Sequence, residues 1–358
     1  MSTTDLPLLL RTQHFTTTLS NSCKDFQSRV GRPAAVDSDG VTPCVVVLSR
    51  ADDREMDYLS LGLAARGIPM LRMDSDRCAG TQLWWDPATG TLCWDGQRFR
   101  PRVCWHRYFD LEAMPFTGVP ASGVLTGYSR ALWSAWATVL RSDNNIRTIN
   151  AAARPGWPDR LTQLAAARRV GLATPATVVT TRPSDAVELL SGRGDLLVKS
   201  LGPHAVESEP GSVRGVFPQR IGRQQLSAEN GVEQAPVIVQ EYVSAPSELR
   251  IYVVGGRFFG YRIIRPTPDA PWTAPDSIQV RPWEVPTRLS TALVRLTDLF
   301  GLDICAFDLL DTADGPIFLE VNPECEWLWS ERPVGSAAVS TAVRDLIVGW
   351  YEEEPGSV

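Results

Sequence analysis

The chain has 358 residues, of which 44% are hydrophobic and 21% are charged, a composition typical of a globular protein larger than one small domain. Its formal net charge of −6 gives no general attraction to a phosphate backbone, which excludes nucleic acid as an expected partner. The aliphatic runs are far shorter than the roughly 20 residues that span a bilayer, and no basic n-region marks a secretory signal, so we expect no membrane segment and a cytoplasmic location. Seven scattered cysteines without a C-x-x-C pair predict buried, reduced thiols rather than a zinc site or a disulfide framework.

The first part of the chain predicts an extension followed by an α/β domain. Residues 1–40 lack clear periodicity and end in a linker-like stretch, so we expect them to form an N-terminal extension, whose role the sequence does not indicate. An apolar strand at 44–49, an amphipathic helix at 53–66 and a second strand at 68–73 form a β-α-β pattern, which predicts a parallel sheet. The domain is expected to cover residues 41–150 and to include a hairpin at 83–85 and 91–94, a strand at 102–107 and a Trp-rich helix at about 128–140.

The rest of the chain alternates helices with strand pairs, which predicts two α+β lobes with antiparallel hairpins over residues 151–236 and 237–358. A cleft between two such lobes is a natural place for a nucleotide. The expected helices lie at 160–170, 184–190, near 224, 288–300 and 339–352. The expected strands lie at 177–180, 196–199, 237–241, 249–254, 257–264, 304–310 and 317–322.

Two strands near the C-terminus, joined by a tight turn at 311–315, carry acidic and amide side chains. Glu320 and Asn322 are two residues apart and therefore point to the same side of their strand, while Asp308 lies on the partner strand. Three oxygen ligands from paired strands suit a hard cation such as Mg²⁺ that is shared with phosphates. The alternative is that Asp308 and Glu320 are only exposed strand residues, because their spacing has no unique geometry.

Lysine is rare in this chain. Among its 35 basic residues, only Lys24 and Lys199 are lysine. Lys199 ends the apolar run LLVK and precedes a flexible turn, a position from which its ammonium could reach a phosphate. The alternative is a strand-end lysine whose charge lies in solvent while its stem covers apolar surface. Its retention in a chain that otherwise uses arginine favours the functional interpretation.

The segment VIVQEYV at 237–243 indicates a buried strand that breaks at a Ser-Ala-Pro linker. Backbone groups at such a break can contact the edge of an adenine ring, and a carboxylate that follows can bind ribose. Glu248 and Arg250 share a strand face, so one could hold ribose while the other faces a phosphate or an acyl group, with a surface ion pair as the alternative. No P-loop or glycine-rich Rossmann turn occurs in a strand-to-helix context, which disfavours those nucleotide sites.

The order of these features resembles the ATP-grasp superfamily, which includes glutathione synthetase and the ribosomal-protein glutamate ligase. The matching segments run from about residue 101 to 335 and are PDRLTQLAAARRVGLATPAT, LLVKS, VIVQEYVSAPSELRIYVVGGRFFG and the two metal strands. Within the superfamily, FLEVNPECEWLWSE and RVCWHR are similar to the microviridin-type ribosomal peptide maturases, or graspetide synthetases, in which a Trp-rich stretch follows the metal-binding E-x-N. The alternative for this stretch is that Trp327 and Trp329 are ordinary core aromatics.

The resemblance implies an ATP-grasp fold, in which an N-terminal α/β domain precedes two lobes that clamp ATP. It implies that Lys199 contacts the ATP phosphates, that Glu248 binds ribose, and that Arg250 lies near the γ-phosphate and the acyl-phosphate. Arg160 departs from the pattern, because the family usually has a second ATP-binding lysine there and a guanidinium binds phosphate in a forked geometry. The other implied residues are Gln240, Glu241, Tyr242 and Val243 around adenine, Asp308, Glu320 and Asn322 on Mg²⁺ or Mn²⁺, and Arg265 and Arg281 facing the same centre as Arg250.

By the same resemblance, the chain is expected to be a ligase that uses ATP to convert a carboxylate into an acyl-phosphate, with release of ADP. The expected substrate is a precursor peptide, in which Asp or Glu side chains become joined to Thr, Ser or Lys through ester or amide bonds to give macrocycles. A homodimer is expected by analogy alone. Two alternatives stay open: an ATP-grasp ligase that adds an amino acid or amine to a peptide or metabolite, and an inactive nucleotide-binding regulatory protein.

Overall fold

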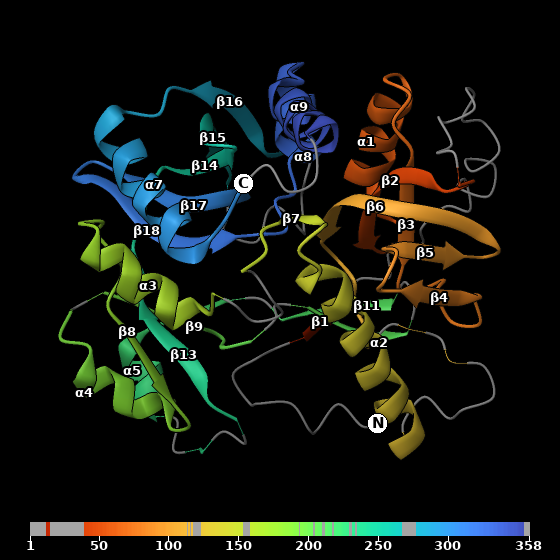
Figure 1. The fold of residues 1–358 in the computed structure, drawn as a ribbon. Helices are drawn as coiled ribbons and strands as arrows, with labels where there is room; N and C mark the ends of the chain where they lie inside the picture. The colour runs from red at the N-terminus through yellow and green to blue at the C-terminus, as the bar shows by residue number, and fades with distance from the viewer. Residues whose placement is uncertain are drawn as a thin grey trace.

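The computed structural model describes residues 12–14, 39–112, 114, 116, 123–152, 158–192, 194–202, 205–209, 212–216, 218–228, 231–232, 235–266 and 277–353. In these residues the strands form four sheets, of which three are larger and one has three strands (Figure 1). No helix in this part of the chain is long and apolar enough to cross a membrane. Six cysteines are buried and free, as predicted, while Cys23 lies outside the described residues.

The first sheet has the strand order β3-β2-β6-β5-β4, with β7 against β6. The predicted β-α-β unit is confirmed, because β2 (Thr42–Ser49) and β3 (Met70–Asp74) are parallel and α1 (Arg54–Ala64) connects them. Asp53 begins α1 by accepting a hydrogen bond from the N–H of Met56. The other elements are the predicted hairpin of β4 (Leu83–Asp86) and β5 (Thr91–Trp94), then β6 (Gln97–His106), α2 (Val124–Ser142) and β7 (Arg147–Ile149).

β6 is longer than the strand that the sequence predicts at 102–107. From Phe99 onward it pairs in parallel with β2, whereas its first residues, Gln97 to Phe99, pair antiparallel with β5. Gln97 and Arg98 in that first part are exposed, so they give no apolar alternation by which a strand could be recognised.

The second sheet has the order β12-β9-β13-β8, with antiparallel neighbours. Val198 and Val239 pack toward α4 and α5, so the opposite face carries Lys199 and Gln240. β13 pairs in this sheet, although its residues follow the lobe boundary expected after residue 236. The elements are β8 (Thr177–Thr180), η1 (Pro183–Asp185), α4 (Ala186–Leu189), β9 (Leu196–Ser200), β12 (Gln219–Ile221), α5 (Arg223–Ala228) and β13 (Val237–Glu241).

A small sheet contains strands that the sequence did not predict. β10 (Ala205–Glu209) and β11 (Ser212–Val216) form a hairpin, and β1 (Thr12–His14) pairs antiparallel with β11. β1 lies in the N-terminal extension, so this part of the extension contributes to the fold.

The third sheet has the order β16-β15-β14-β17-β18 and is antiparallel throughout. Leu249 and Phe307 lie on the face that packs against α3 and α7, while Tyr252 lies on the face that packs against α9 and the first domain. α3, expected in the central lobe, packs here instead through its buried Leu164 and Ala167 (Figure 1). The elements are α3 (Arg160–Arg169), β14 (Ser247–Val254), β15 (Arg257–Ile264), β16 (Gln279–Trp283), α7 (Thr287–Phe300), β17 (Ile304–Thr312), β18 (Gly315–Asn322), α8 (Leu328–Glu331), η3 (Arg332–Val334) and α9 (Ala338–Glu352).

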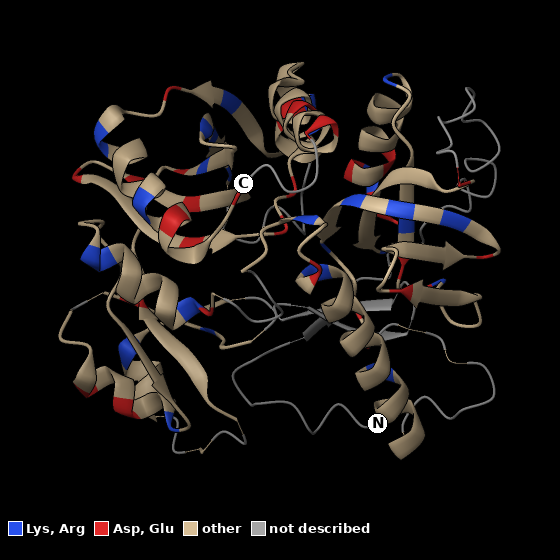
Figure 2. Ribbon diagram, in the orientation of Figure 1, with Lys and Arg blue, Asp and Glu red and all other residues tan. Residues whose placement is uncertain are grey.

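Charged residues of both signs are interspersed over the elements of the three larger sheets (Figure 2).

Asn150 joins the first domain to the third sheet. It follows β7, is 4% exposed and has a backbone φ of 53°, a left-handed conformation that asparagine tolerates. Its Oδ1 accepts from the N–H groups of Asp303 and Ile304, and its Nδ2 donates to the carbonyls of Ile304 and Pro323. Its own N–H donates to the Asp303 carboxylate at 2.7 Å. One side chain therefore satisfies backbone groups at the start of β17 and after the end of β18.

We expect Asn150→Ala to lower the free energy of unfolding by about 2 kcal/mol or more, because each buried backbone group left without a partner costs about 1–3 kcal/mol. Urea denaturation would measure the loss. The exposed Asn145→Ala serves as the matched control and should change stability by less than about 0.5 kcal/mol. Equal stability of the two variants would contradict the junction role of Asn150.

Candidate nucleotide and metal site

Two carboxylates and an amide meet on the strand pair of β17 and β18. Asp308 and Glu320 stand opposite each other in the register, beside a β-bulge, and Asn322 follows two residues later on the same face. The Asn322 Nδ2 donates to Asp308 Oδ2 at 2.7 Å. Burial raises the pKa of Asp308, and repulsion from Glu320 adds to this shift against the opposing effect of Arg250. A cation bound here would offset the repulsion between the two carboxylates.

The donors of this cluster suit Mg²⁺. Within the described ranges, no group of three or more His, Cys, Asp and Glu side chains is placed to hold a metal ion. A metal on this strand pair would therefore rest on two carboxylates and one amide oxygen, with phosphates and water completing an oxygen set of the kind that Mg²⁺ favours. Asn322 directs its Nδ2 toward both carboxylates, so ligation requires its amide to rotate and present Oδ1.

Two arginines lie on the same face of the third sheet. Arg250 on β14 is 8% exposed and donates from Nη1 to Asp308 Oδ2 at 2.6 Å. Arg265 forms an ion pair with Glu248, and its positive charge also opposes the rise in the pKa of Asp308. The alternative of a surface pair between Glu248 and Arg250 is wrong, because each has a different and largely buried partner.

Arg160, at the start of α3, connects the acidic cluster to the second sheet. Its Nε lies 3.3 Å from Glu320 Oε2, and its Nη1 donates to the carbonyl of Ser200 at 2.8 Å. α3 is held in place by Gln163, whose side chain both donates to and accepts from the backbone of Val321. Arg160 therefore lies beside the acidic cluster, where its planar fork contacts both units.

Lys199 approaches the cluster from the second sheet. Burial lowers the pKa of its ammonium to about 8, Glu320 opposes this shift, and Arg160 adds to it. Lys199 is only partly exposed, and its ammonium interacts electrostatically with both groups. This setting does not favour the alternative of a strand-end lysine with its charge in solvent.

The linker after β13 lies where the sequence predicts a break between two strands. Gln240 is 2% exposed, lies on the same sheet face as Lys199, and donates from Nε2 to Thr177 Oγ1. Val243 lines a cavity of about 340 Å³ between the linker and the turn that joins β17 to β18. The N–H groups of Glu241 and Tyr242 are bonded to the carbonyls of Ala176 and Asp195, so neither is available in this state to contact an adenine.

The structure does not bring Arg281 to this group. Arg281 lies on the edge strand β16 and is paired in the register with Arg262, which is paired in turn with Leu249. Cross-strand partners share a face, so Arg281 lies on the face opposite to Arg250. The register, which depends on long-range pairing, therefore contradicts the expectation that Arg281 faces the same centre.

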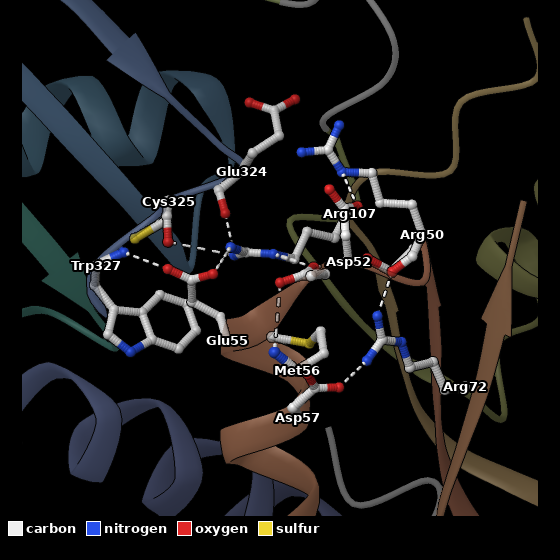
Figure 3. A network of polar contacts seen from close by, with 12 residues as sticks. Arg50, Asp52, Glu55, Met56, Asp57, Arg72, Arg107, Glu324, Cys325 and Trp327 are labelled. Carbon is white, nitrogen blue, oxygen red and sulfur yellow. Dashed lines mark hydrogen bonds and ion pairs between the residues drawn. The ribbon is translucent and has the colours of Figure 1, made fainter. Parts of the chain in front are cut away.

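Arg107 is a buried cation next to the site that sequence reasoning missed. Its side chain is 0% exposed, with Nε 2.8 Å from Asp53 Oδ2 and Nη2 3.7 Å from Glu55 Oε2. Its Nη1 donates to the carbonyls of Glu324 and Cys325, just after β18 (Figure 3). Although burial opposes the charged form, Asp53 and Glu55 hold the pKa of Arg107 above its usual value. In the sequence, the feature that could have indicated this burial is the position of Arg107 directly after a buried strand.

The Trp-rich stretch packs against the same arginine. The rings of Trp105 and Trp327 are stacked with centroids 6.2 Å apart, and the Arg107 guanidinium lies 5.0 Å from the Trp327 ring. Glu55 accepts from the N–H groups of Trp327 and Leu328 at 3.2 Å each. Trp327 is 1% exposed but Trp329 is 40% exposed, so the core-aromatic interpretation holds for Trp327 alone. The segments RVCWHR and ECEWLW therefore contact each other.

No protein-family model matches the chain. By sequence it is similar to a probable alpha-L-glutamate ligase of Stenotrophomonas maltophilia strain K279a, with 31% identity over 176 residues that cover 46% of this chain and 55% of the relative. A relative of the same name from Methanococcoides burtonii is 27% identical over 219 residues, or 56% of this chain and 64% of that protein. The chain thus spans between about half and two thirds of the length of these curated relatives.

Solved structures match over most of the chain. The macrocyclase MdnC from Microcystis aeruginosa, bound with the precursor peptide MdnA, has a TM-score of 0.68 at 21% identity and covers 86% of this chain and 100% of MdnC. A RiPP-associated ATP-grasp ligase from Chryseobacterium gregarium, in complex with ADP and a leader and core peptide, has a TM-score of 0.71 at 20% identity, covering 88% and 99%. D-alanyl-alanine synthetase A from Vibrio cholerae gives 0.57 at 12% identity, covering 89% and 99%.

These likenesses establish the fold. The chain has the ATP-grasp fold with an N-terminal α/β domain, as the sequence predicts. Its similar proteins include probable alpha-L-glutamate ligases by sequence and, by structure, a macrocyclase and a RiPP-associated ATP-grasp ligase, each bound with peptide.

We expect Arg107→Met to lower the free energy of unfolding by about 3–5 kcal/mol, because Asp53 would remain buried without its cation. Chemical denaturation followed by tryptophan fluorescence would measure the change. Arg100→Ala, which removes a more exposed ion pair with Asp39, should cost at most about 1 kcal/mol. Adding Asp53→Asn to Arg107→Met should recover part of the loss, and no recovery would contradict a loss caused by the unpaired charge.

Proposed function

We propose that this chain is an ATP-dependent ligase that converts a carboxylate into an acyl-phosphate, releases ADP, and passes the acyl group to a hydroxyl or amine of a peptide. The observation that carries the proposal is the meeting of cations and acids from different units. Lys199 and Arg160 adjoin Glu320, which stands opposite Asp308. Such a set suits a metal-bound triphosphate, in which cations contact the phosphates and carboxylates hold the metal.

A carboxylate is a poor electrophile until one of its oxygens becomes part of a leaving group, which phosphorylation supplies. When bound by Asp308, Glu320 and Asn322, Mg²⁺ would neutralise charge on the transferring phosphate. Arg250 presents a guanidinium fixed by its bond to Asp308, so it can stabilise the transferring group with little rearrangement. We propose the same electrostatic role for Lys199, with Arg265 and Arg160 adding positive charge beside it.

For the nucleoside, we propose that residues 240–243 frame the adenine and that Glu248 binds the ribose. The cavity beside Val243 and the position of Gln240 on the face of Lys199 support this assignment. Because the N–H groups of two linker residues are already bonded, an adenine contact by a linker N–H falls to Val243. A ribose hydroxyl at Glu248 would share that carboxylate with Arg265.

For the substrate, we propose a precursor peptide that becomes cyclised through side-chain ester or amide bonds. MdnC is a macrocyclase bound with a precursor peptide, and the Chryseobacterium gregarium ligase is in complex with a leader and core peptide. In this chain, the support is the Arg107 network, which joins the two segments that resemble the peptide maturases.

A second candidate, favoured by the sequence similarity to alpha-L-glutamate ligases, is the addition of an amino acid to a peptide or metabolite. The third interpretation, an inactive nucleotide-binding protein, is not favoured, because such a protein has no need of the clustered Asp308, Glu320 and Asn322. Use of Mn²⁺, a homodimer, a cytoplasmic location and the division of the chain into three domains after an extension stay predictions.

Asp308→Asn and Glu320→Gln are each expected to lower ADP formation about 100-fold or more, because each removes a proposed metal ligand. A coupled ADP assay with Mg²⁺ and the acceptor peptide would measure the loss, and thermal unfolding would verify that the variants fold. Asp298→Asn, which changes an exposed acid on α7, a helix that packs on the same sheet, is the matched control and should retain activity. Unchanged turnover in both ligand variants would refute the metal assignment.

The proposed peptide chemistry predicts a loss of one water per bond formed. The chain, Mg-ATP and a short precursor peptide encoded beside its gene would be incubated and examined by intact-mass spectrometry, with Asp308→Asn as the inactive control. Successive water losses, with fragment ions missing between the linked side chains, are the expected result. A gain equal to an amino-acid residue would support the second candidate instead, and AMP in place of ADP would refute the acyl-phosphate route.

A further inference from the structure

Trp329 is an exposed tryptophan two residues from a buried one. Trp327 is 1% exposed, whereas Trp329 is 40% exposed. An indole gains stability in proportion to the apolar area that it buries, so an indole at the surface forgoes part of that gain. Because single exposed apolar residues are common on protein surfaces, the surroundings of Trp329 decide what it does.

Trp329 adjoins the charged cluster of the proposed site. The guanidinium carbon of Arg250 lies 5.9 Å from the centroid of the Trp329 ring, within the range of a cation–π contact. The same guanidinium donates to Asp308 at 2.6 Å. An exposed apolar ring therefore borders the arginine that we propose to stabilise the transferring phosphoryl group.

The residues after Trp329 hold it in place. Ser330 Oγ lies 2.8 Å from the Tyr252 hydroxyl and donates to the carbonyl of Trp327 at 2.9 Å. Glu331, which is 1% exposed, accepts from Ser340 Oγ at 2.5 Å and so ties α8 to α9. Because the backbone around it is fixed, Trp329 can contact a ligand with little further loss of chain freedom.

We propose that Trp329 is a wall of the peptide subsite, where its ring packs on the segment that carries the attacking hydroxyl or amine and excludes water from the acyl-phosphate. This inference rests on the proposed ligase function. It assigns to Trp329 a role in acyl transfer that is separate from phosphoryl transfer, which the cations and metal ligands carry.

Two reactions compete for the acyl carbon. In ligation, the hydroxyl oxygen or amine nitrogen attacks this carbon, the bond from carbon to the phosphate oxygen breaks, phosphate leaves with the electron pair, and the nucleophile loses a proton to phosphate or solvent. In hydrolysis, water attacks instead and regenerates the carboxylate. Both reactions follow the formation of one ADP, so the number of ester or amide bonds formed per ADP distinguishes them.

The test compares bonds formed per ADP in the wild type and in variants, using the same precursor peptide as above. Trp329→Ala is expected to reduce this ratio about tenfold and to raise the KM for the peptide, because removing an aromatic anchor is among the costliest interface truncations, while the KM for ATP changes little. Trp329→Phe should retain most of the coupling. Trp84→Ala is the matched control, because Trp84 is 42% exposed but lies on β4 of the first sheet.

If Trp329→Ala forms as many bonds per ADP as the wild type, the inference is overturned. A loss of ADP formation in parallel with bond formation would also overturn it, because Trp329 would then serve phosphoryl transfer or folding. The proposed function fails in a different way, since the wild type itself would then form no bond with the peptide.

Discussion

The arrangement around the site depends on one buried charge, that of Arg107. A guanidinium removed from water is stable only where acids and carbonyls satisfy it. Here the acids come from the start of α1 and the carbonyls from residues 324–325. Because these carbonyls follow Asn322 by only a few residues, Arg107 fixes the end of the strand that carries the proposed metal ligands. The first domain thus shapes a site whose charged groups lie outside it.

The charged groups themselves are divided between two units. Asp308, Glu320 and Arg250 lie on the third sheet, while Lys199 comes from the second. Opposite charges from separate sheets attract, but burial disfavours the charged forms, because it lowers the pKa of Lys199 and raises the pKa of Asp308. A ligand that brings both phosphates and metal would satisfy the two sets at once, which is the physical reason for placing a nucleotide between them.

Local patterns were sufficient to predict most strands, the β-α-β unit and the hairpin that carries Asp308 and Glu320, because alternation and turn residues are encoded nearby in the chain. Features set by distant pairing were not predictable. The sheet to which β13 belongs, the pairing of β1 with β11, and the face on which Arg281 lies all depend on long-range register. Burial of Arg107 likewise follows from tertiary contacts with segments far away in the sequence, which local patterns do not encode.

The packing of α3 on the third sheet has a consequence for any movement between the second and third sheets. Gln163 ties α3 to β18, so Arg160 and Glu320 belong to one unit, whereas the bond from Arg160 to the Ser200 carbonyl crosses to the second sheet. Separation of the two sheets would therefore break the bond to Ser200 and keep the contact with Glu320. A lysine at this position, lacking the planar fork, would hold the two units together less firmly.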